Sequence, residues 1–401
     1  MLPVSLIEYF FTFASIKRWN DYPKMVELVE LDKQAHKFII AFFLANMEKD
    51  INKIHLIEAG IFELLRRGII TDIRPDIFRD VLQKKEKELN EWVLSKLHRK
   101  LIDIEDGKFY ERFKNYLEDS NMYKKERFIL KAASYIATRW EFKIVYQTSK
   151  FLSEIDQVKD EVEDEIKDYY ELIGVKEIAL NKNLVKIIDL SGRLRFQKRW
   201  AQTPRIPETS VLGHMLIVAI FGYFYSTHIK ACELRVENNF YCALFHDLPE
   251  ALTRDIISPV KYSVSGLDDI ISEYEIKIIE NKILPHVPLH MVNNFKYLLG
   301  LYGNNQKDEF LNKINNKNIE IVDSLTNYNE NKYNAIDGVA LKNCDRLSAF
   351  IEVILSISHG VKSKELAEGK EVIKKSLKTK GKVDGVDFYE LAVNIENYFS
   401  N

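Results

Sequence analysis

The chain has 401 residues, of which 46% are hydrophobic and 29% are charged, enough for two or three domains with packed cores and too apolar for a disordered protein. Its 58 basic and 60 acidic residues leave a formal net charge of −2, which excludes overall positive charge as a means of binding long nucleic acids. The cysteines have neither paired nor CxxC spacing, which indicates reduced thiols and a cytoplasmic location.

The first predicted element lies at the N-terminus, where MLPVSLIEYFFTFASIKRW (1–19) is largely apolar. Glu8 interrupts this run and no basic stretch precedes it, so we expect a packed helix rather than a signal peptide or a membrane span. Further on, residues 85–105 repeat apolar side chains every three or four positions, the helical period. Because strand-like alternation is scarce, the sequence predicts an all-α protein that does not enter a membrane.

The chain contains an apparent internal repeat. ASIKRW (14–19) resembles RFQKRW (195–200), and QAHKFIIAFFLA (34–45) resembles LGHMLIVAIFGY (212–223). In this comparison His36 lies opposite His214. Shared composition alone would also produce similar helical segments, but a common order of rare Trp and His residues favours a duplication.

Two later blocks extend the repeat: GIITDIRPDI (68–77) matches ALTRDIISPV (251–260), and ILKAASYIA (129–137) matches ALKNCDRLSA (340–349), which places Ser134 opposite Asp345. The first copy has Glu63-Leu64 where the second has His246-Asp247, so we interpret it as inactive.

The predicted domains follow from the repeat. They are a degenerate helical domain at 1–150, a charged helical linker at 151–184, and a catalytic domain at 185–401. Within the last, the Asn- and Lys-rich stretch 303–338 predicts a loose insertion.

Four side chains of the second half form a pattern with metal-binding chemistry. His214 lies in the apolar segment 210–225, where a single histidine is more often a core residue than a ligand. His246-Asp247 follows directly after another apolar run, and Asp345 lies within the apolar segment 343–354. Two imidazoles and two carboxylates suit one divalent transition metal, Mn, Fe, Co, Ni or Zn.

This H…HD…D pattern resembles that of the HD-domain metal-dependent phosphohydrolases. Within them, the second half is similar to the bacterial 5′-deoxynucleotidases, through Arg199-Trp200, the motif H-D-x-x-E-x-L-T-x-D at 246–255, and Asp345. The resemblance covers about residues 185–400. It implies two tandem HD-domain helical bundles, the first of them degenerate.

The resemblance also implies roles for individual residues. The metal ligands would be His214, His246, Asp247 and Asp345. Glu250 and the ligand Asp247 would be catalytic, with Glu250 orienting or deprotonating the attacking water. Arg199 would contact the 5′-phosphate, Trp200 would shape the sugar pocket, and Asp255 would bind the 3′-hydroxyl of deoxyribose. Each of these three residues also has a structural alternative, which is a polar helix face for Glu250, a helix cap for Asp255 and a core position for Trp200.

The expected function is removal of the 5′-phosphate from deoxyribonucleoside monophosphates by a metal-activated water. Two alternatives stay open. One is another HD-superfamily reaction, a dNTP triphosphohydrolase or a phosphodiesterase, and the other is a nucleotide sensor or scaffold. The expected partner is a small nucleotide, and the two halves are expected to pair as an internal pseudo-dimer, with further homo-oligomers an open alternative.

Overall fold

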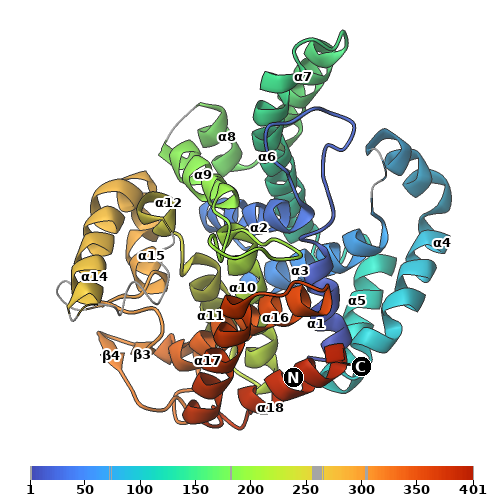
Figure 1. Cartoon of the computed structure of the whole chain (residues 1–401). Helices are drawn as coiled ribbons and strands as arrows, with labels where there is room; N and C mark the ends of the chain where they lie inside the picture. The colour runs from blue at the N-terminus through green and yellow to red at the C-terminus, as the bar shows by residue number, and fades with distance from the viewer. Residues whose placement is uncertain are drawn as a thin grey trace. The chain divides into compact units, whose positions relative to one another are not determined.

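The protein is almost entirely helical, as the sequence predicts. The computed structural model describes residues 2–71, 73, 75–180, 183–254, 264, 266–302 and 306–400. These residues fold as helices joined by short turns and a few short strands (Figure 1), which confirms the all-α prediction. The chain divides into two compact units, Met1–Lys176 and Glu177–Asn401. The division falls inside the segment 151–184.

The first unit is built around one long helix pair. Its helices are α1 (Val4–Thr12), α2 (Glu30–Met47), α3 (Lys53–Ile69), α4 (Pro75–Leu101), α5 (Lys108–Glu118), α6 (Lys124–Ser149) and α7 (Ile155–Asp164), and α8 (Ile173–Ala179) crosses the division. Helix α2 packs along α6, and sixteen consecutive residues of α2, from Glu30 to Ala45, are buried. The N-terminal segment forms α1, which buries apolar side chains such as Phe10. It is a packed helix, as expected.

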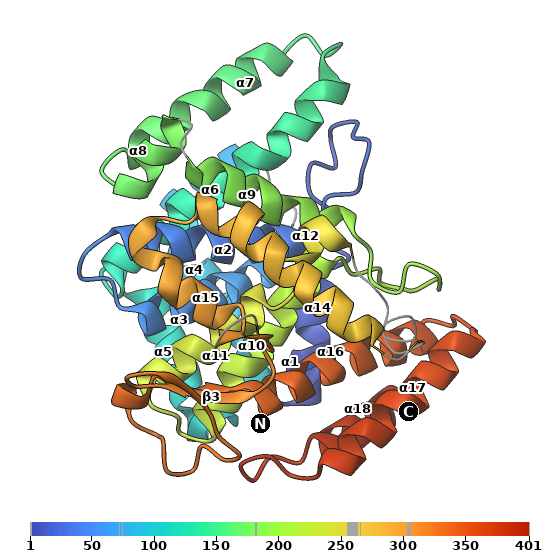
Figure 2. The same cartoon turned by 90° about the vertical axis from the view of Figure 1, so that its left-hand side faces the viewer.

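The second unit is built around three helices that carry most of the predicted site. Its helices are α9 (Asn183–Arg193), α10 (Val211–His228), α11 (Glu233–Phe245), α12 (Glu250–Thr253), α14 (Leu267–Ile278), α15 (Val292–Leu298), α16 (Gly338–Ser358), α17 (Lys364–Lys380) and α18 (Phe388–Ser400). Helix α10 packs against both α11 and α16 (Figures 1 and 2). Gly222 permits this approach, because a Cβ there would lie 2.9 Å from Leu341 Cδ2 and 3.4 Å from the Asn239 carbonyl oxygen.

Short turns of other types complete the chain. They are the 3-10 turns η1 (Ile104–Gly107), η2 (Glu165–Tyr169), η3 (Leu194–Phe196), η5 (Leu284–His286), η6 (Leu289–Met291) and η7 (Asn331–Tyr333), and the π turn η4 (Ile279–Ile283).

The prediction of a loose insertion at 303–338 is wrong for its described part. β1 (Leu301–Tyr302) pairs antiparallel with β2 (Gln306–Lys307), and β3 (Asn312–Asn315), β4 (Ile319–Ile321) and β5 (Ile336–Asp337) form a sheet in the order β4-β3-β5. Ile314, Leu325 and Ala335 make a small core beneath it. The high Asn and Lys content hid these few apolar anchors, which are enough to order the segment.

Helix α10 is apolar enough to be mistaken for a membrane span. It has 18 residues with a mean hydropathy of 1.3, but 89% of them are buried inside the protein. It is therefore the central core helix of the second unit, and its apolarity reflects packing on all sides.

Candidate metal centre

His214 lies in the first turn of α10, where the local sequence fixes its position. The Ser210 side chain caps the helix by accepting a hydrogen bond of 2.9 Å from the Gly213 amide. The His214 ring is fully buried, with Nδ1 3.1 Å from Ser348 Oγ and Nε2 3.0 Å from Asp345 Oδ1. Burial lowers the pKa of His214, and the nearby Arg199 charge lowers it further. A neutral imidazole is the form that binds metals.

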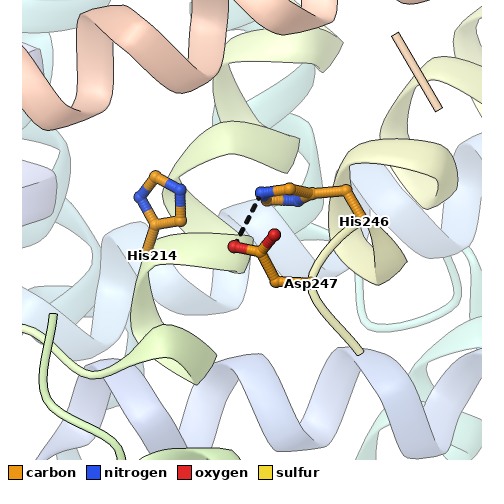
Figure 3. Close-up of side chains that lie close together, drawn as sticks. All are labelled: His214, His246 and Asp247. Atoms are coloured by element: carbon orange, nitrogen blue, oxygen red, sulfur yellow. Dashed lines mark ion pairs between the residues drawn. The ribbon is translucent and has the colours of Figure 1, made fainter. Parts of the chain in front are cut away.

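His246 and Asp247 follow directly after α11, so the end of that helix points both side chains into the core. Nδ1 of His246 lies 2.6 Å from the Ala243 carbonyl oxygen. A carbonyl only accepts, so Nδ1 carries the hydrogen and Nε2 of the neutral ring keeps its lone pair. That Nε2 is 3.0 Å from Asp247 Oδ2 (Figure 3) but has no hydrogen-bond partner among the described residues.

His246 and Asp247 each shift the pKa of the other. Burial alone would lower the pKa of His246, but the adjacent Asp247 carboxylate outweighs burial and raises it. Burial opposes the Asp247 charge, yet His246, His214 and Arg199 together hold the pKa of this carboxyl well below its usual range.

Asp345 approaches the same position from α16. Its Oδ1 contacts His214, and its Oδ2 is 2.8 Å from Lys342 Nζ. Burial raises its pKa, but Lys342 and the two histidines outweigh burial and keep it far below the ordinary value.

The ligand atoms of His214, His246 and Asp247 all lie within 4.8 Å of one another (Figure 3), and Asp345 joins them through His214. Buried imidazole nitrogens beside carboxylate oxygens form a donor set that a divalent cation fits. The buried Nε2 lone pair of His246 supports this fit, since it faces an anionic oxygen and a cation between them would satisfy both.

Arg199 and Trp200 lie in the loop before α10, which a bridge between Lys198 and Ser210 holds in place. Arg199 Nη1 is 3.9 Å from Asp247 Oδ2, so this guanidinium borders the candidate centre. Trp200 donates from Nε1 to Glu352 Oε2 at 2.9 Å. The structure therefore brings two of the three predicted substrate-binding residues to the site.

Glu250 begins α12, where its amide donates to the Asp247 carbonyl at 3.0 Å. Its side chain is 9% exposed, one turn beyond the HD pair. Asp255, the predicted contact for the sugar hydroxyl, lies outside the described residues.

Glu352 is a residue of this site that sequence reasoning missed. Its buried carboxylate accepts hydrogen bonds from Thr209 Oγ1 at 2.5 Å and from Arg199 Nε at 3.4 Å. It also lies 3.7 Å from Arg205 Nη1. Burial alone would raise the pKa of Glu352, but the positive charges of Arg205 and Arg199 outweigh burial and lower the pKa to about 2. The sequence could have indicated Glu352 by its spacing, because it follows Asp345 by two helical turns and therefore lies on the same face of α16.

Lys342 was also missed. It precedes Asp345 by one turn, its side chain is 37% exposed, and its ammonium lies 4.2 Å from the centre of the Phe310 ring. Phe310 in turn packs near the His246 ring, with ring centres 5.7 Å apart. The folded insertion therefore supplies one wall of the candidate centre.

Comparison with known families identifies this part of the chain. Residues 191–374 match the HD domain family, a range that contains the HD pair, His214, Asp345 and Glu352. Comparison with curated proteins finds no match. Residues 191–374 therefore form a domain of the HD superfamily, whose members are generally metal-dependent hydrolases.

Proposed function

We propose that the second unit hydrolyses the 5′-phosphate ester of deoxyribonucleoside monophosphates, with one divalent transition metal held by His214, His246, Asp247 and Asp345. The observation that carries this proposal is the convergence of two buried imidazoles and an aspartate within 4.8 Å, inside a domain of a phosphohydrolase superfamily. The choice of substrate rests on the resemblance of residues 199–200 and 246–255 to the deoxynucleotidases.

The residues around the centre suit attack of water on phosphorus. A divalent ion there would polarise a phosphoryl oxygen and lower the pKa of a water molecule towards neutrality. Glu250, within one helical turn of Asp247, accepts the proton of the attacking water. The P–O5′ bond breaks, the leaving O5′ takes up a proton from solvent so that the nucleoside departs as the alcohol, and Glu250 then releases its proton to solvent.

The charge of the site supports an anionic substrate. The side chains joined by ion pairs here are Asp247, Asp345 and Glu352 with Arg199, Arg205 and Lys342. With the Glu250 carboxylate there are four acidic groups against three cations, so a divalent ion would leave one net positive charge, which favours a phosphate ester. Arg199 and Lys342 are the cations that border the candidate centre, and we assign both to the phosphoryl oxygens.

An activity assay with matched variants tests the proposal. Phosphate release from a panel of nucleotides with Mn²⁺ or Co²⁺ should be seen with the wild-type protein and with Asp323→Ala, an exposed control. It should fall at least about 1,000-fold in Asp247→Ala, which corresponds to about 4 kcal/mol of lost stabilisation. Release of triphosphate from dNTPs would assign the triphosphohydrolase reaction instead, and tight nucleotide binding without turnover would assign a sensor.

Lys342→Gln tests the second phosphate contact. We expect phosphate to bind about 10- to 100-fold more weakly, because one charge-assisted hydrogen bond is lost, while bound metal stays unchanged. Calorimetric titration of the Mn²⁺-loaded protein with inorganic phosphate measures the phosphate affinity, and elemental analysis measures the bound metal. Lys364→Gln, whose side chain is 82% exposed, is the control. Loss of metal in Lys342→Gln would show instead that the lysine acts only by positioning Asp345.

A further inference from the structure

The loop before α2 in the first unit repeats the backbone of the loop before α10 in the second. Lys17 bridges Val29 as Lys198 bridges Ser210. The next residue donates from its amide across the loop in both, from Arg18 to the Leu28 carbonyl at 2.8 Å and from Arg199 to Thr209 at 3.0 Å. The two bridged residues are equally far apart in the sequence in both loops, and so are the two residues joined by the amide hydrogen bond. Each loop then leads into a helix of 18 residues.

The tryptophans of the two loops share an uncommon conformation. Trp19 has φ 56° and Trp200 has φ 57°, a left-handed region that bulky side chains seldom adopt. Two unrelated loops would rarely place this strain at the same position.

A buried glutamate holds the Arg-Trp pair in both units. Arg18 Nε and Trp19 Nε1 donate to Glu141 Oε2 at 2.8 and 3.1 Å, as Arg199 and Trp200 donate to Glu352 Oε2 in the second unit. Glu141 lies on α6, the helix that packs along α2, as α16 packs along α10. Helices α6 and α16 therefore correspond.

These correspondences fix what lies at the metal position of the first unit. Counting from the loops, Lys33 stands where the second unit has His214; counting back from the glutamates, Ser134 stands where it has Asp345. Lys33 Nζ donates to Ser134 Oγ at 2.6 Å, the counterpart of the 3.0 Å contact between His214 Nε2 and Asp345 Oδ1.

The register corrects one part of the sequence comparison. His36 does not correspond to His214; it lies one turn further along α2 and packs edge-on against Trp140, with ring centres 5.4 Å apart. The pairing of Ser134 with Asp345 agrees with the structure.

The first unit supplies with its own side chains the positive charge that an ion would bring. Lys33 is 7% exposed, and burial lowers its pKa to about 7 against the attraction of Glu30. Glu30 also pairs with Arg18 at 2.9 Å and with Arg67 at 3.5 Å. A hydroxyl and an amine already bonded to each other offer poor ligands to a divalent ion.

We propose that the first unit is a copy of the HD domain in which the amino group of Lys33 occupies the metal position, so that this unit binds no metal and hydrolyses no substrate. The proposal rests on the proposed function only in taking His214 as a metal ligand.

Metal stoichiometry in the full chain tests the proposal. After loading with Mn²⁺ and removal of excess ion, elemental analysis should give one equivalent per chain for the wild type and close to none for Asp247→Ala. Two equivalents in the wild type, with one retained in Asp247→Ala, would overturn it while leaving the proposed function intact. One equivalent in both proteins would overturn both proposals. No bound metal in the wild type would overturn the proposed function, and with it the replacement of an ion by Lys33.

A second variant tests the role of Lys33 directly. Lys33→Met should keep one equivalent of Mn²⁺, and it should not lower the melting temperature at pH 7, because burial already disfavours the lysine ammonium in the folded chain. Lys49→Met, at an exposed position in the same unit, should change neither property. A loss of Mn²⁺ in Lys33→Met would contradict the proposal.

Discussion

Replacing His246 by alanine should abolish both metal binding and hydrolysis. The Ala243 carbonyl fixes the ring so that Nε2 presents its lone pair to the space beside Asp247, and no neighbouring atom can take over this role after truncation. We expect bound Mn²⁺ to fall to background and phosphate release to fall at least about 1,000-fold. Elemental analysis and a phosphate assay on the same preparation measure the two effects.

His228→Ala is the matched control, because this histidine ends α10 at an exposed position. It should retain full metal content and activity. If His246→Ala kept its metal while losing activity, the imidazole would act on the substrate and the proposed ligand set would be wrong.

Glu352→Gln should strongly destabilise the second unit. The carboxylate lies between the Arg199 and Arg205 guanidinium groups in the core, and the amide removes the negative charge that both groups share. A pKa lowered from 4.5 to about 2 corresponds to about 3 kcal/mol of stability at neutral pH. Chemical denaturation of the metal-free protein at pH 7 measures this difference.

The same effect predicts a pH dependence. Because the pKa of Glu352 is lower in the folded chain, its contribution is complete above the ordinary value of 4.5 and is lost as the pH falls towards 2. The difference between wild type and Glu352→Gln should therefore shrink over that range. Glu368→Gln, whose side chain is 64% exposed, should show no difference at any pH. A gap that stays constant down to pH 3 would contradict the assignment.

The predicted ligand positions could be found from the sequence because their residue types are costly in their surroundings. A buried histidine on the apolar helix α10, a His-Asp pair after an apolar run and an aspartate within α16 all need compensation in a core. Three such exceptions in one half of a chain indicate a common partner. The structure places these side chains together, although their binding of an ion stays a prediction.

Lys342 and Glu352 could not be recognised in the same way. Both lie on α16, where charged residues alternate with apolar ones as they do on any helix with a solvated face. Only the packing of α16 against α10 shows that Glu352 is buried and that Lys342 reaches Asp345. Phe310 was hidden for a different reason, since its segment has the composition of a loop.

The register of the first unit also required three-dimensional contacts. Sequence comparison paired His36 with His214, because identical residues score well. The bridge between Lys17 and Val29 and the hydrogen bond from Arg18 to Glu141 instead place Lys33 at the position that His214 has in the second unit. A substitution of His by Lys carries no sequence similarity, and the amino group of Lys33 takes the place that the imidazole and its ion would fill in the second unit.

The most direct test of the proposed metal centre is a crystal structure of the Mn²⁺-loaded protein with an anomalous difference map recorded at the manganese edge. We predict one peak in the second unit, about 2.0–2.3 Å from Nε2 of His214 and His246 and from carboxylate oxygens of Asp247 and Asp345. A map in which these side chains bind no common ion, or in which the ion lies elsewhere, would contradict the central claim.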